Sequence, residues 1–521
     1  MVIAKRERRK GYRFYNFLIT GIQLILVLIL NLGVDLSFAN PLLNINTENQ
    51  VLYDNTEASS LSYVNSNTIQ PMSYYKIAPF IDNVKRTIPE IETISDIAYY
   101  IKPLHGINGR FYFTNEENTF LEGQSGLKLQ KGVNFFLFEE GYLSLGQSFV
   151  FYCQLKQSNN SDETTFELFR TYAKFLLGKV SLEVGKDNVN LGPGEYGLLL
   201  SDNVEPYPLI KLQTEDYLKF LGKWDFLFLH GWLLEEREDV SNPKIFAIRI
   251  VWKPFDFLEL GCTKINMFGG RGQPGYSIVD YPAIIAEYKR DDVEEDNSEE
   301  KFDTEAFVGY DISINLPISK LISIVKAVRL YFQEAATDMN APWIKSDEYK
   351  KKFKLLNRAY QTGIFLSTQK NIFRLEYAVT DYSFYLHSLY NVEGFTYKGL
   401  SLGYPFGRNM ESIFFKHRYY FNNMFSFEYK IGRYQLPLFE GEDDNRKIGD
   451  LMLPSTDAEE KMVRDYISLS ADLRIEDLYV NTYVKIEKTD NYDDNFLPTQ
   501  FNIVDEDKIF QTFGVSIIYK F

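Results

Sequence analysis

The sequence predicts an all-β protein: a transmembrane antiparallel β-barrel of about 18 strands with a short N-terminal helical element at the periplasmic side. Three observations predict this fold class. Tyr and Phe contribute 37 and 42 of the 521 residues, apolar and polar residues alternate along many segments, and short turns alternate with long charged connectors. Aromatic side chains gather at both interfaces of a membrane barrel, and a period of two places opposite chemistry on the two faces of a strand.

The first segment has the pattern of an export signal. Basic residues precede an apolar stretch from Phe17 to Leu32, and a small-residue cleavage pattern ends at Ala39. The uninterrupted apolar core runs only from Leu24 to Leu30, short of the roughly 18 residues that a spanning helix needs. We therefore expect a signal peptide over residues 1–39 rather than an uncleaved anchor.

Two segments separate this signal from the barrel. Residues 40–78 are rich in Asn, Ser and Thr without periodicity, which is typical of a flexible leader. Within residues 79–105, apolar residues recur every three or four positions on both sides of Pro89, which predicts two short helices. These helices would either restrict the periplasmic mouth of the lumen or cover the edge of the first strand. The barrel itself is expected over residues 106–521.

The alternation that predicts strands is clearest in the C-terminal half. Around residue 428, apolar and polar residues alternate: Phe425, Phe427, Tyr429 and Ile431 against Ser426, Glu428, Lys430 and Gly432. The last segment, Lys508 to Phe521, alternates in the same way, and its terminal aromatic residue resembles the assembly signal of outer-membrane barrels. A soluble β-sandwich would also alternate, but its outer face would be polar and its turns would not divide into short and long sets.

The connectors fall into the two sets that a membrane barrel needs. Asn422 and Asn423 tolerate the positive φ values of a tight hairpin turn, which fits a short periplasmic connection. Long polar connectors at 291–300, 441–446, 489–494 and 505–507 are expected to face outward. The connector at 291–300 is almost entirely acidic and could gather calcium, although a block of like charges is more often solvated.

Charge and cysteine content narrow the possible partners. The formal net charge of −15 argues against nucleic-acid binding, which requires clustered Lys and Arg. Cys153 and Cys262 are the two cysteines, which could pair in an exported protein or remain two unpaired thiols.

Two glycine-rich stretches carry a resemblance to a known family. The first runs from Gly185, Lys186 and Asp187 through Leu191–Gly194 to Leu198–Asn203, and the second runs from Tyr390 through Gly394–Gly399 to Gly403–Asn409. Together with Leu330–Glu334 and Leu375–Tyr377, in order and approximate spacing, they resemble the Wzi-type capsule assembly family. Leu191 stands where that family usually has Trp, and Tyr404 where a His is common.

The resemblance implies a non-enzymatic protein of the bacterial outer membrane. Its outer loops would bind, or help to assemble or anchor, capsular or related surface polysaccharide. The implied partners are this polysaccharide, outer-membrane lipid and the barrel assembly machinery, with the protein expected to be a monomer and to need no cofactor.

The candidate ligand-binding residues are charged positions expected to face the lumen, together with one tyrosine. An acidic glycan would be held by cationic and hydroxyl groups and by aromatic rings that stack on sugar faces. The candidates are Asp187, Asp202, Glu334, Arg374, Glu376 and Tyr397. Structural ion pairing inside the barrel is the alternative role for the charged members.

Two other functions compete with polysaccharide handling. A solute-conducting porin would need an open lumen. A hydrolase would need a nucleophile and base, but His105, His230, His387 and His417 are scattered without metal-ligand spacing, and no catalytic set can be named. We therefore predict no catalytic and no metal-binding residues.

Overall fold

The computed structural model describes most of the barrel and little of the N-terminal region. The described residues are 69–70, 99–273, 281, 304–340, 354–437, 446–448, 451–453, 461–490 and 507–521, apart from gaps at 117–118, 122–124, 147, 160–163, 319–321, 323, 382, 387–389, 391 and 423. The expected signal peptide, nearly all of the leader and residues 79–98 of the helical element lie outside them. The acidic connector 291–300 and most of the connectors at 441–446, 489–494 and 505–507 also lie outside.

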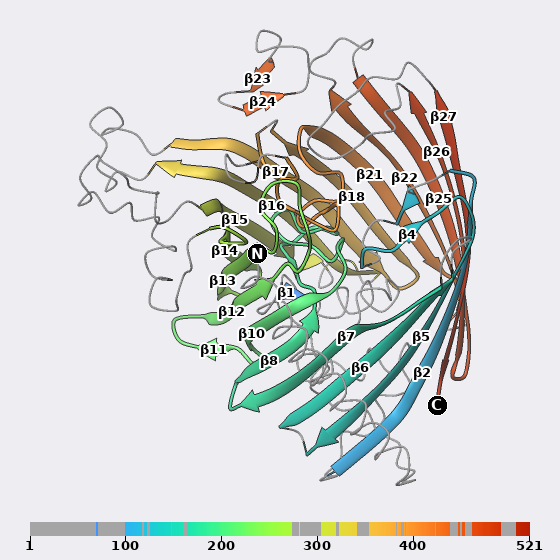
Figure 1. Ribbon diagram of the computed structural model, residues 1–521. Coiled ribbons are helices and arrows are strands. Elements are labelled where there is room, and N and C mark those ends of the chain that lie inside the picture. The colour runs from blue at the N-terminus through green and yellow to red at the C-terminus, as the bar shows by residue number, and fades with distance from the viewer. Residues whose placement is uncertain are drawn as a thin grey trace, which may run out of the picture.

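Eighteen strands form one closed antiparallel barrel, as predicted (Figure 1). The first nine are β2 (Tyr99–Thr114), β5 (Gly132–Leu145), β6 (Phe149–Asn159), β7 (Thr164–Leu177), β8 (Val180–Asp187), β10 (Tyr207–Thr214), β12 (Lys223–Trp232), β13 (Lys244–Phe255) and β14 (Leu258–Phe268). The other nine are β15 (Thr304–Leu316), β16 (Val325–Asn340), β17 (Lys354–Thr368), β18 (Asn371–Thr380), β21 (Met410–Tyr420), β22 (Phe425–Pro437), β25 (Lys461–Ile475), β26 (Leu478–Asp490) and β27 (Lys508–Lys520).

Each strand of the barrel pairs with its neighbours along the chain, and the last strand pairs with the first. Gly106–Thr114 of β2 pair with Thr512–Lys520 of β27. Because this closure leaves no free sheet edge, the backbone donors and acceptors of the wall find partners within the wall, as a bilayer requires. Among the described residues, no helix has the length and apolar character needed to cross a membrane.

The barrel begins earlier than the sequence predicted. β2 starts at Tyr99, so residues 99–105, which we expected at the end of the helical element, belong to a strand. The pairing of β2 with β5 shifts register between Lys102 and Gly106. This irregularity interrupts the period-two pattern, which explains why the boundary at residue 106 was wrong.

Short turns and long connections lie at opposite ends of the barrel. The turns at 256–257, 369–370 and 476–477 lie at the end where the C-terminus lies, whereas the connections at 188–206 and 381–409 lie at the other end. In outer-membrane barrels the short turns face the periplasm, so the long connections face outward. The turn after β21 spans residues 421–424, longer than the two residues expected, and the Asn422 Oδ1 accepts the N–H groups of Met424 and Phe425, each at 2.8 Å.

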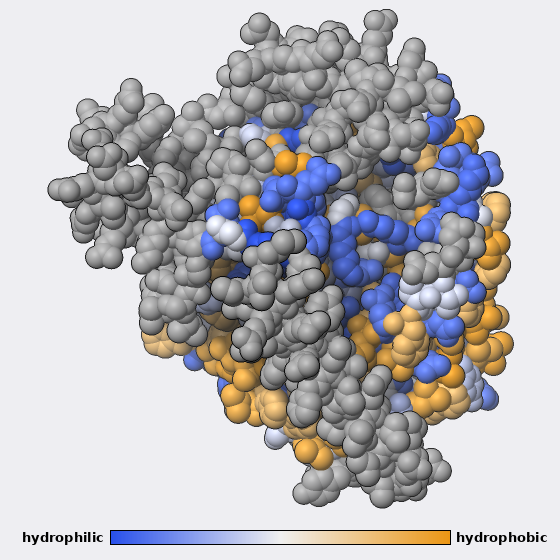
Figure 2. Space-filling view, viewed as in Figure 1, coloured by the Kyte–Doolittle hydropathy of each residue, from blue (hydrophilic) through white to orange (hydrophobic). Residues whose placement is uncertain are grey.

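The outer face of the wall is apolar, as the alternation predicts. Figure 2 shows hydrophobic side chains over the flank of the barrel and hydrophilic ones gathered within it. On β27, Phe513, Val515, Ile517 and Tyr519 are exposed, whereas Thr512 is buried on the other face. Outward-facing aromatic side chains cluster near the short turns: Phe220, Trp224, Trp252, Phe255, Phe257, Phe421 and Phe521. They form the aromatic girdle of that interface.

The structure also determines the environments of His417, Cys153 and Cys262. Lys416 faces the lumen, so His417 faces outward, where its ring stacks on Phe373 with centroids 4.3 Å apart. Cys153 and Cys262 are both free thiols, the first buried and the second exposed.

The inner face of the wall carries buried ion pairs between strands. Lys211 Nζ lies 2.8 Å from Glu183, and Lys174 Nζ lies 2.7 Å from Glu215. Arg249 donates two hydrogen bonds, of 2.7 and 3.0 Å, to the carboxylate of Asp311, two strands away. Such pairs satisfy charges that the surrounding low-dielectric environment would otherwise destabilise.

Candidate functional site

Three long connections fold back from the outer end into the lumen. They are residues 115–131 between β2 and β5, residues 188–206 between β8 and β10, and residues 381–409 between β18 and β21. They carry short strands: β3 (Thr119–Phe120), β4 (Lys128–Leu129), β9 (Asn190–Leu191), β19 (Thr396–Tyr397) and β20 (Leu400–Ser401). We call these three connections the plug. A fourth segment reaches it, because β1 (Ile69–Gln70) pairs with β9, and Figure 1 places β1 inside the wall.

The plug contains both glycine-rich stretches that the sequence singled out, except for Gly185–Asp187, which belong to β8 in the wall. They pair with one another: Ser201 donates its N–H to the carbonyl of Leu402 at 2.7 Å, and its hydroxyl to the carbonyl of Gly403. The hydroxyl of Tyr385 donates to the carbonyl of Leu198. Apolar side chains from both stretches share one buried cluster with inward-facing residues of the wall, such as Leu229. Ser201 and Leu402 are 201 residues apart in the sequence. The two stretches therefore form a single packed unit from distant parts of the chain.

Glycine is required where the plug touches itself and the wall. A Cβ on Gly197 would lie 1.9 Å from the carbonyl oxygen of Leu200. A Cβ on Gly194 would lie 2.2 Å from Nε2 of Gln361 on β17. The Cβ at Gly197 would meet backbone, and the Cβ at Gly194 would displace a buried side chain that is hydrogen-bonded to Tyr196 and Glu376, so these glycines set how tightly the plug can pack.

One carboxylate fixes the plug to the wall. Glu195 Oε2 lies 2.6 Å from Lys416 Nζ on β21, and its Oε1 lies 3.2 Å from Lys430 Nζ on β22. Arg374 Nε on β18 lies 3.4 Å from the same carboxylate. We call these four residues the Glu195 cluster. Burial disfavours the charged carboxylate, but the three cations outweigh it and hold the pKa of Glu195 far below its usual range.

Neighbouring polar groups complete this attachment. The backbone N–H of Glu195 donates to Glu376 Oε2 at 2.8 Å, and Tyr331 on β16 donates its hydroxyl to the same oxygen at 2.7 Å. Gln361 Nε2 donates to the carbonyl of Tyr196 at 3.0 Å and to Glu376 Oε1 at 2.8 Å. Strands β16, β17, β18, β21 and β22 thus all hold the tip of one plug segment.

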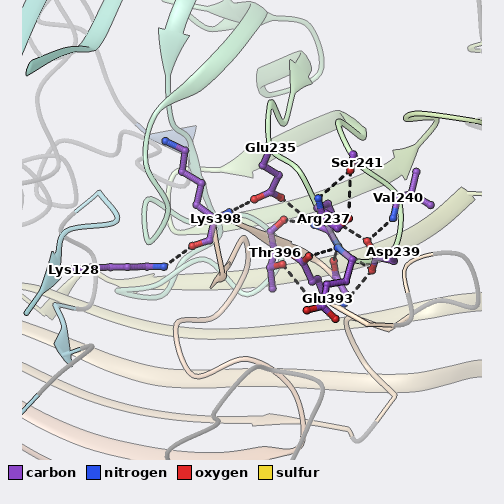
Figure 3. A network of polar contacts seen from close by, with 11 residues as sticks. Lys128, Glu235, Arg237, Asp239, Val240, Ser241, Glu393, Thr396 and Lys398 are labelled. Carbon is purple, nitrogen blue, oxygen red and sulfur yellow. Dashed lines mark hydrogen bonds and ion pairs between the residues drawn. The ribbon is translucent and has the colours of Figure 1, made fainter. Parts of the chain in front are cut away.

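A second network ties the outer surface of the plug together (Figure 3). Arg237, between β12 and β13, donates to the backbone carbonyls of Thr396 at 2.9 Å and Gly394 at 2.7 Å. Its guanidinium also lies 2.8 Å from Asp239. Asp239 accepts the N–H of Glu393 at 2.9 Å. We call this network the Arg237 knot. It joins the 233–243 connection to the second glycine-rich stretch.

Lysines gather at the outer rim beside this knot. The ammonium of Lys398 pairs with Glu205, and Lys156 Nζ lies 3.6 Å from Glu205 and 3.0 Å from Glu167. Lys186 Nζ lies 3.9 Å from Glu167, and Lys128 donates to the carbonyl of Lys398 at 2.6 Å. These four lysines form what we call the basic rim. Partial burial lowers the pKa of Lys128, and the nearby ammonium of Lys398 adds to that effect.

The six predicted ligand residues do not form one site. Arg374 and Glu376 lie together beneath the plug tip, as described above. Asp187 is buried in the wall, 2.8 Å from Arg170 and 3.5 Å from Lys211. Asp202 is buried in the plug, and its carbonyl accepts the N–H of Ser125. Tyr397 is buried in the plug, edge-on to Tyr207 with centroids 6.0 Å apart.

Glu334 faces the opposite way from the expected direction. Its neighbour Gln333 contacts Gly192 in the plug, so alternation turns Glu334 outward. There its carboxylate pairs with Arg358 and accepts a hydrogen bond from the hydroxyl of Tyr310. Glu334 therefore does not face the lumen.

The residues that organise the plug carry little signal in the sequence. Glu195 was not singled out, although it is the one charged residue between Leu191 and Leu200 and needs a counter-charge there. The sequence gives no role to Lys416 and Lys430, because their partner lies more than 200 residues away, 235 in the case of Lys430. Among the described residues, no group of three or more His, Cys, Asp or Glu side chains is placed to hold a metal ion.

The chain is similar to known capsule assembly proteins in sequence and in fold. A family model described as capsule assembly protein Wzi matches residues 114–495. Wzi from Escherichia coli, described as an outer membrane protein involved in group 1 capsule assembly and as a carbohydrate-binding β-barrel, is a similar solved structure. The TM-score is 0.64 at 16% sequence identity, covering 93% of this chain and 100% of that one. No curated protein sequence matches this chain.

Other barrels are similar to a smaller extent. OprD from Pseudomonas aeruginosa gives a TM-score of 0.45 at 10% identity, covering 80% of this chain and 94% of that one. OccAB2 from Acinetobacter baumannii gives 0.44 at 11% identity, covering 80% and 97%.

Proposed function

Because the chain belongs to the family of the capsule assembly protein Wzi and is an outer-membrane β-barrel, we propose that it binds an exported acidic polysaccharide at its outer face. In this proposal the protein holds the polysaccharide at the cell surface and does not cleave it. The observation that carries the proposal is the basic rim, where Lys156, Lys186 and Lys398 pair with Glu167 and Glu205, and Lys128 lies beside Lys398. Four lysines against the carboxylates of Glu167, Glu205 and Glu235 leave a small local excess of positive charge in a chain with a net charge of −15, and this excess points to an anionic ligand.

The chemistry of the rim fits an acidic sugar chain. Lysine ammonium groups make charge-assisted hydrogen bonds to carboxylates, and the side chain of Lys398 is 40% exposed, so it can reach a ligand. Partial burial strengthens such contacts because screening by water and salt is weaker there. The Arg237 knot keeps the backbone of Lys398 in place, because the N–H of Lys398 donates to Glu235.

The plug favours this function over that of a solute-conducting porin. Glu195, Glu376 and Gln361 hold the plug against five strands, and a Cβ at Gly197 would meet the carbonyl oxygen of Leu200. A lumen filled in this way suits a rigid platform for a polymer better than a path for solutes.

Further features of the proposal concern the whole protein. We propose a signal peptide over residues 1–39, a leader over 40–78, a helical element on the periplasmic side that ends before Tyr99, and a barrel that continues to Phe521. We also propose that the protein is a monomer that contacts outer-membrane lipid and is inserted by the barrel assembly machinery. Asp187, Asp202, Arg374 and Glu376 act by ion pairing and hydrogen bonding within the protein, and Tyr397 supports Lys398 beside it.

The test is binding of acidic polysaccharide, prepared from the producing cells, to the purified barrel. Replacing Lys128, Lys186 and Lys398 by Gln should weaken binding at least tenfold, and wild-type binding should weaken as salt rises. The matched control replaces Lys179, Lys219 and Lys223 by Gln at the short-turn end, with the same change in charge. Equal binding by both triple variants would contradict the proposal, as would shortening of the polysaccharide during incubation.

A further inference from the structure

A cavity lies between the plug and one side of the barrel wall. Its empty volume is about 1050 Å³, open mouth included, and the plug contributes Leu121, Glu195 and Tyr196 to its lining. Five tyrosines line it: Tyr112, Tyr196, Tyr466, Tyr479 and Tyr483. We call this space the tyrosine cavity. Its wall is formed by β2, β21, β22 and β25–β27.

The tyrosine cavity extends from the plug toward the short-turn end. Arg418 lies two residues before the end of β21, Tyr479 is the second residue of β26, and Ile518 lies two residues before the end of β27. The basic rim lies at the opposite end, near the outer ends of β6 and β8. The cavity and the rim are therefore separate places.

Two tyrosine rings lie flat on the wall of this cavity. Tyr466 pairs across strands with Gly432, and a Cβ on that glycine would lie 2.5 Å from Cζ of the ring. Tyr112 pairs in the same way with Gly514, where a Cβ would lie 2.5 Å from Cε1. A ring that covers a glycine backbone turns one face to the wall, and the exposed part of each ring, 6% for Tyr466 and 7% for Tyr112, borders the cavity.

Polar side chains surround these rings. Asp472 accepts hydrogen bonds from Asn481 Nδ2 at 2.7 Å, from Ser426 Oγ at 3.0 Å and from the hydroxyl of Tyr479. Lys485 Nζ lies 5.2 Å from the centroid of the Tyr466 ring. The amide nitrogen of Asn108 donates to the hydroxyl of Ser516 at 3.0 Å, and its oxygen accepts from Arg110. Hydroxyls, amides, a carboxylate and an ammonium thus lie around aromatic faces, which is the set of groups that binds sugars.

We propose that the tyrosine cavity is a second saccharide site, one that binds a short pyranose segment from the periplasmic side of the plug. The apolar C–H face of a pyranose packs on an aromatic ring, and its hydroxyls exchange hydrogen bonds with groups such as Asn481 and Asp472. The site deepens the proposed function, on which it rests, by placing a subsite for the same class of ligand on the other side of the closed plug.

The experiment measures oligosaccharide binding to the purified, folded barrel by saturation-transfer NMR. The probes are maltotetraose, which is neutral, and tetragalacturonate, which is acidic. Tyr466→Leu should weaken binding of the better probe at least tenfold, and Tyr466→Phe, which keeps the ring, should lose less than threefold. Tyr429→Leu removes an outward-facing ring of β22 and serves as the matched control. Heat-modifiable gel mobility verifies that each variant is folded.

The outcomes separate this inference from the proposed function. If neither probe binds the wild type while the acidic polysaccharide binds the basic rim, the second site does not exist and the proposed function stands. If the probes bind but Tyr466→Leu binds as the wild type does, the cavity is not their site. If the cavity binds the probes while the lysine variants leave polysaccharide binding unchanged, the outer site fails and the inner one stands.

Discussion

The carboxylate of Glu195, at the tip of the plug, lies 2.6 Å from the ammonium nitrogen of Lys416 on β21. This contact joins a loop from the outer end to the wall in the interior of the barrel. Lys430 and Arg374 contact the same carboxylate, so one anion pairs with three cations. Closure of the lumen therefore depends on a residue that is not part of the wall.

Replacing this anion should destabilise the protein strongly. Glu195→Gln removes the carboxylate that pairs with Lys416, Lys430 and Arg374, and breaking a buried ion pair costs about 3–5 kcal/mol. The free energy of unfolding in urea, measured in lipid vesicles, gives this cost. The control, Asp465→Asn, breaks an ion pair with Arg433 in which both side chains are about half exposed (46% and 52%), and should cost less than about 1 kcal/mol. Equal losses for the two variants would contradict the role of the Glu195 cluster.

The Glu195 cluster also predicts how stability depends on pH. The folded protein lowers the pKa of Glu195, so this stabilisation is complete above the ordinary glutamate pKa of about 4.3. It is lost as the pH falls below about 4.3 toward the folded pKa. The unfolding free energy of the wild type should therefore decline in that acid range by an amount that Glu195→Gln lacks. Parallel curves for the two proteins between pH 5 and pH 2 would contradict this.

Tight packing of the plug should make one glycine irreplaceable. Gly197→Ala forces a Cβ against the carbonyl oxygen of Leu200, and such overpacking costs about 1–3 kcal/mol. We expect the variant barrel to assemble but its plug to be cleaved faster in limited proteolysis. Gly109→Ala on β2 is the control, because nothing lies within 4 Å of the added Cβ. If Gly197→Ala resisted the protease as well as the wild type does, the plug would have space for the added methyl group beside Leu200, which would contradict the prediction.

The Arg237 knot should not tolerate lysine. The guanidinium donates in several directions at once, to two carbonyls and to the carboxylates of Asp239 and Glu235, whereas an ammonium cannot reproduce that planar fork. Arg237→Lys should expose the 381–409 segment to protease added to intact cells. Arg271→Lys changes an exposed ion pair with Glu236 and should leave the digestion pattern as in the wild type. The same pattern for both variants would mean that the knot does not restrain this segment.

The barrel could be predicted from sequence because each strand carries its own signal. Alternation assigns Ser426, Glu428 and Lys430 to the inner face without knowledge of any other strand, and the structure agrees. Glu334 faces outward, contrary to the prediction, because its neighbour Gln333 occupies the inner face. The start of β2 was not predicted because the register shift between Lys102 and Gly106 interrupts the alternation there.

The site depends on contacts between distant residues, which a single sequence does not reveal. The plug is defined by pairs of distant residues such as Ser201 with Leu402. The tyrosine cavity depends in the same way on the cross-strand pairs of Tyr466 with Gly432 and of Tyr112 with Gly514. A charged residue within an apolar stretch, such as Glu195, is the one sequence signal that could have indicated the attachment of the plug.

Single-channel conductance of the purified protein in a planar bilayer at neutral pH tests most directly whether this is a closed, polysaccharide-binding barrel. We predict that the wild type shows no steady conductance and that deletion of residues 192–201 produces open channels. A large, steady conductance of the wild type, unchanged by this deletion, would contradict the account and indicate a solute-conducting porin.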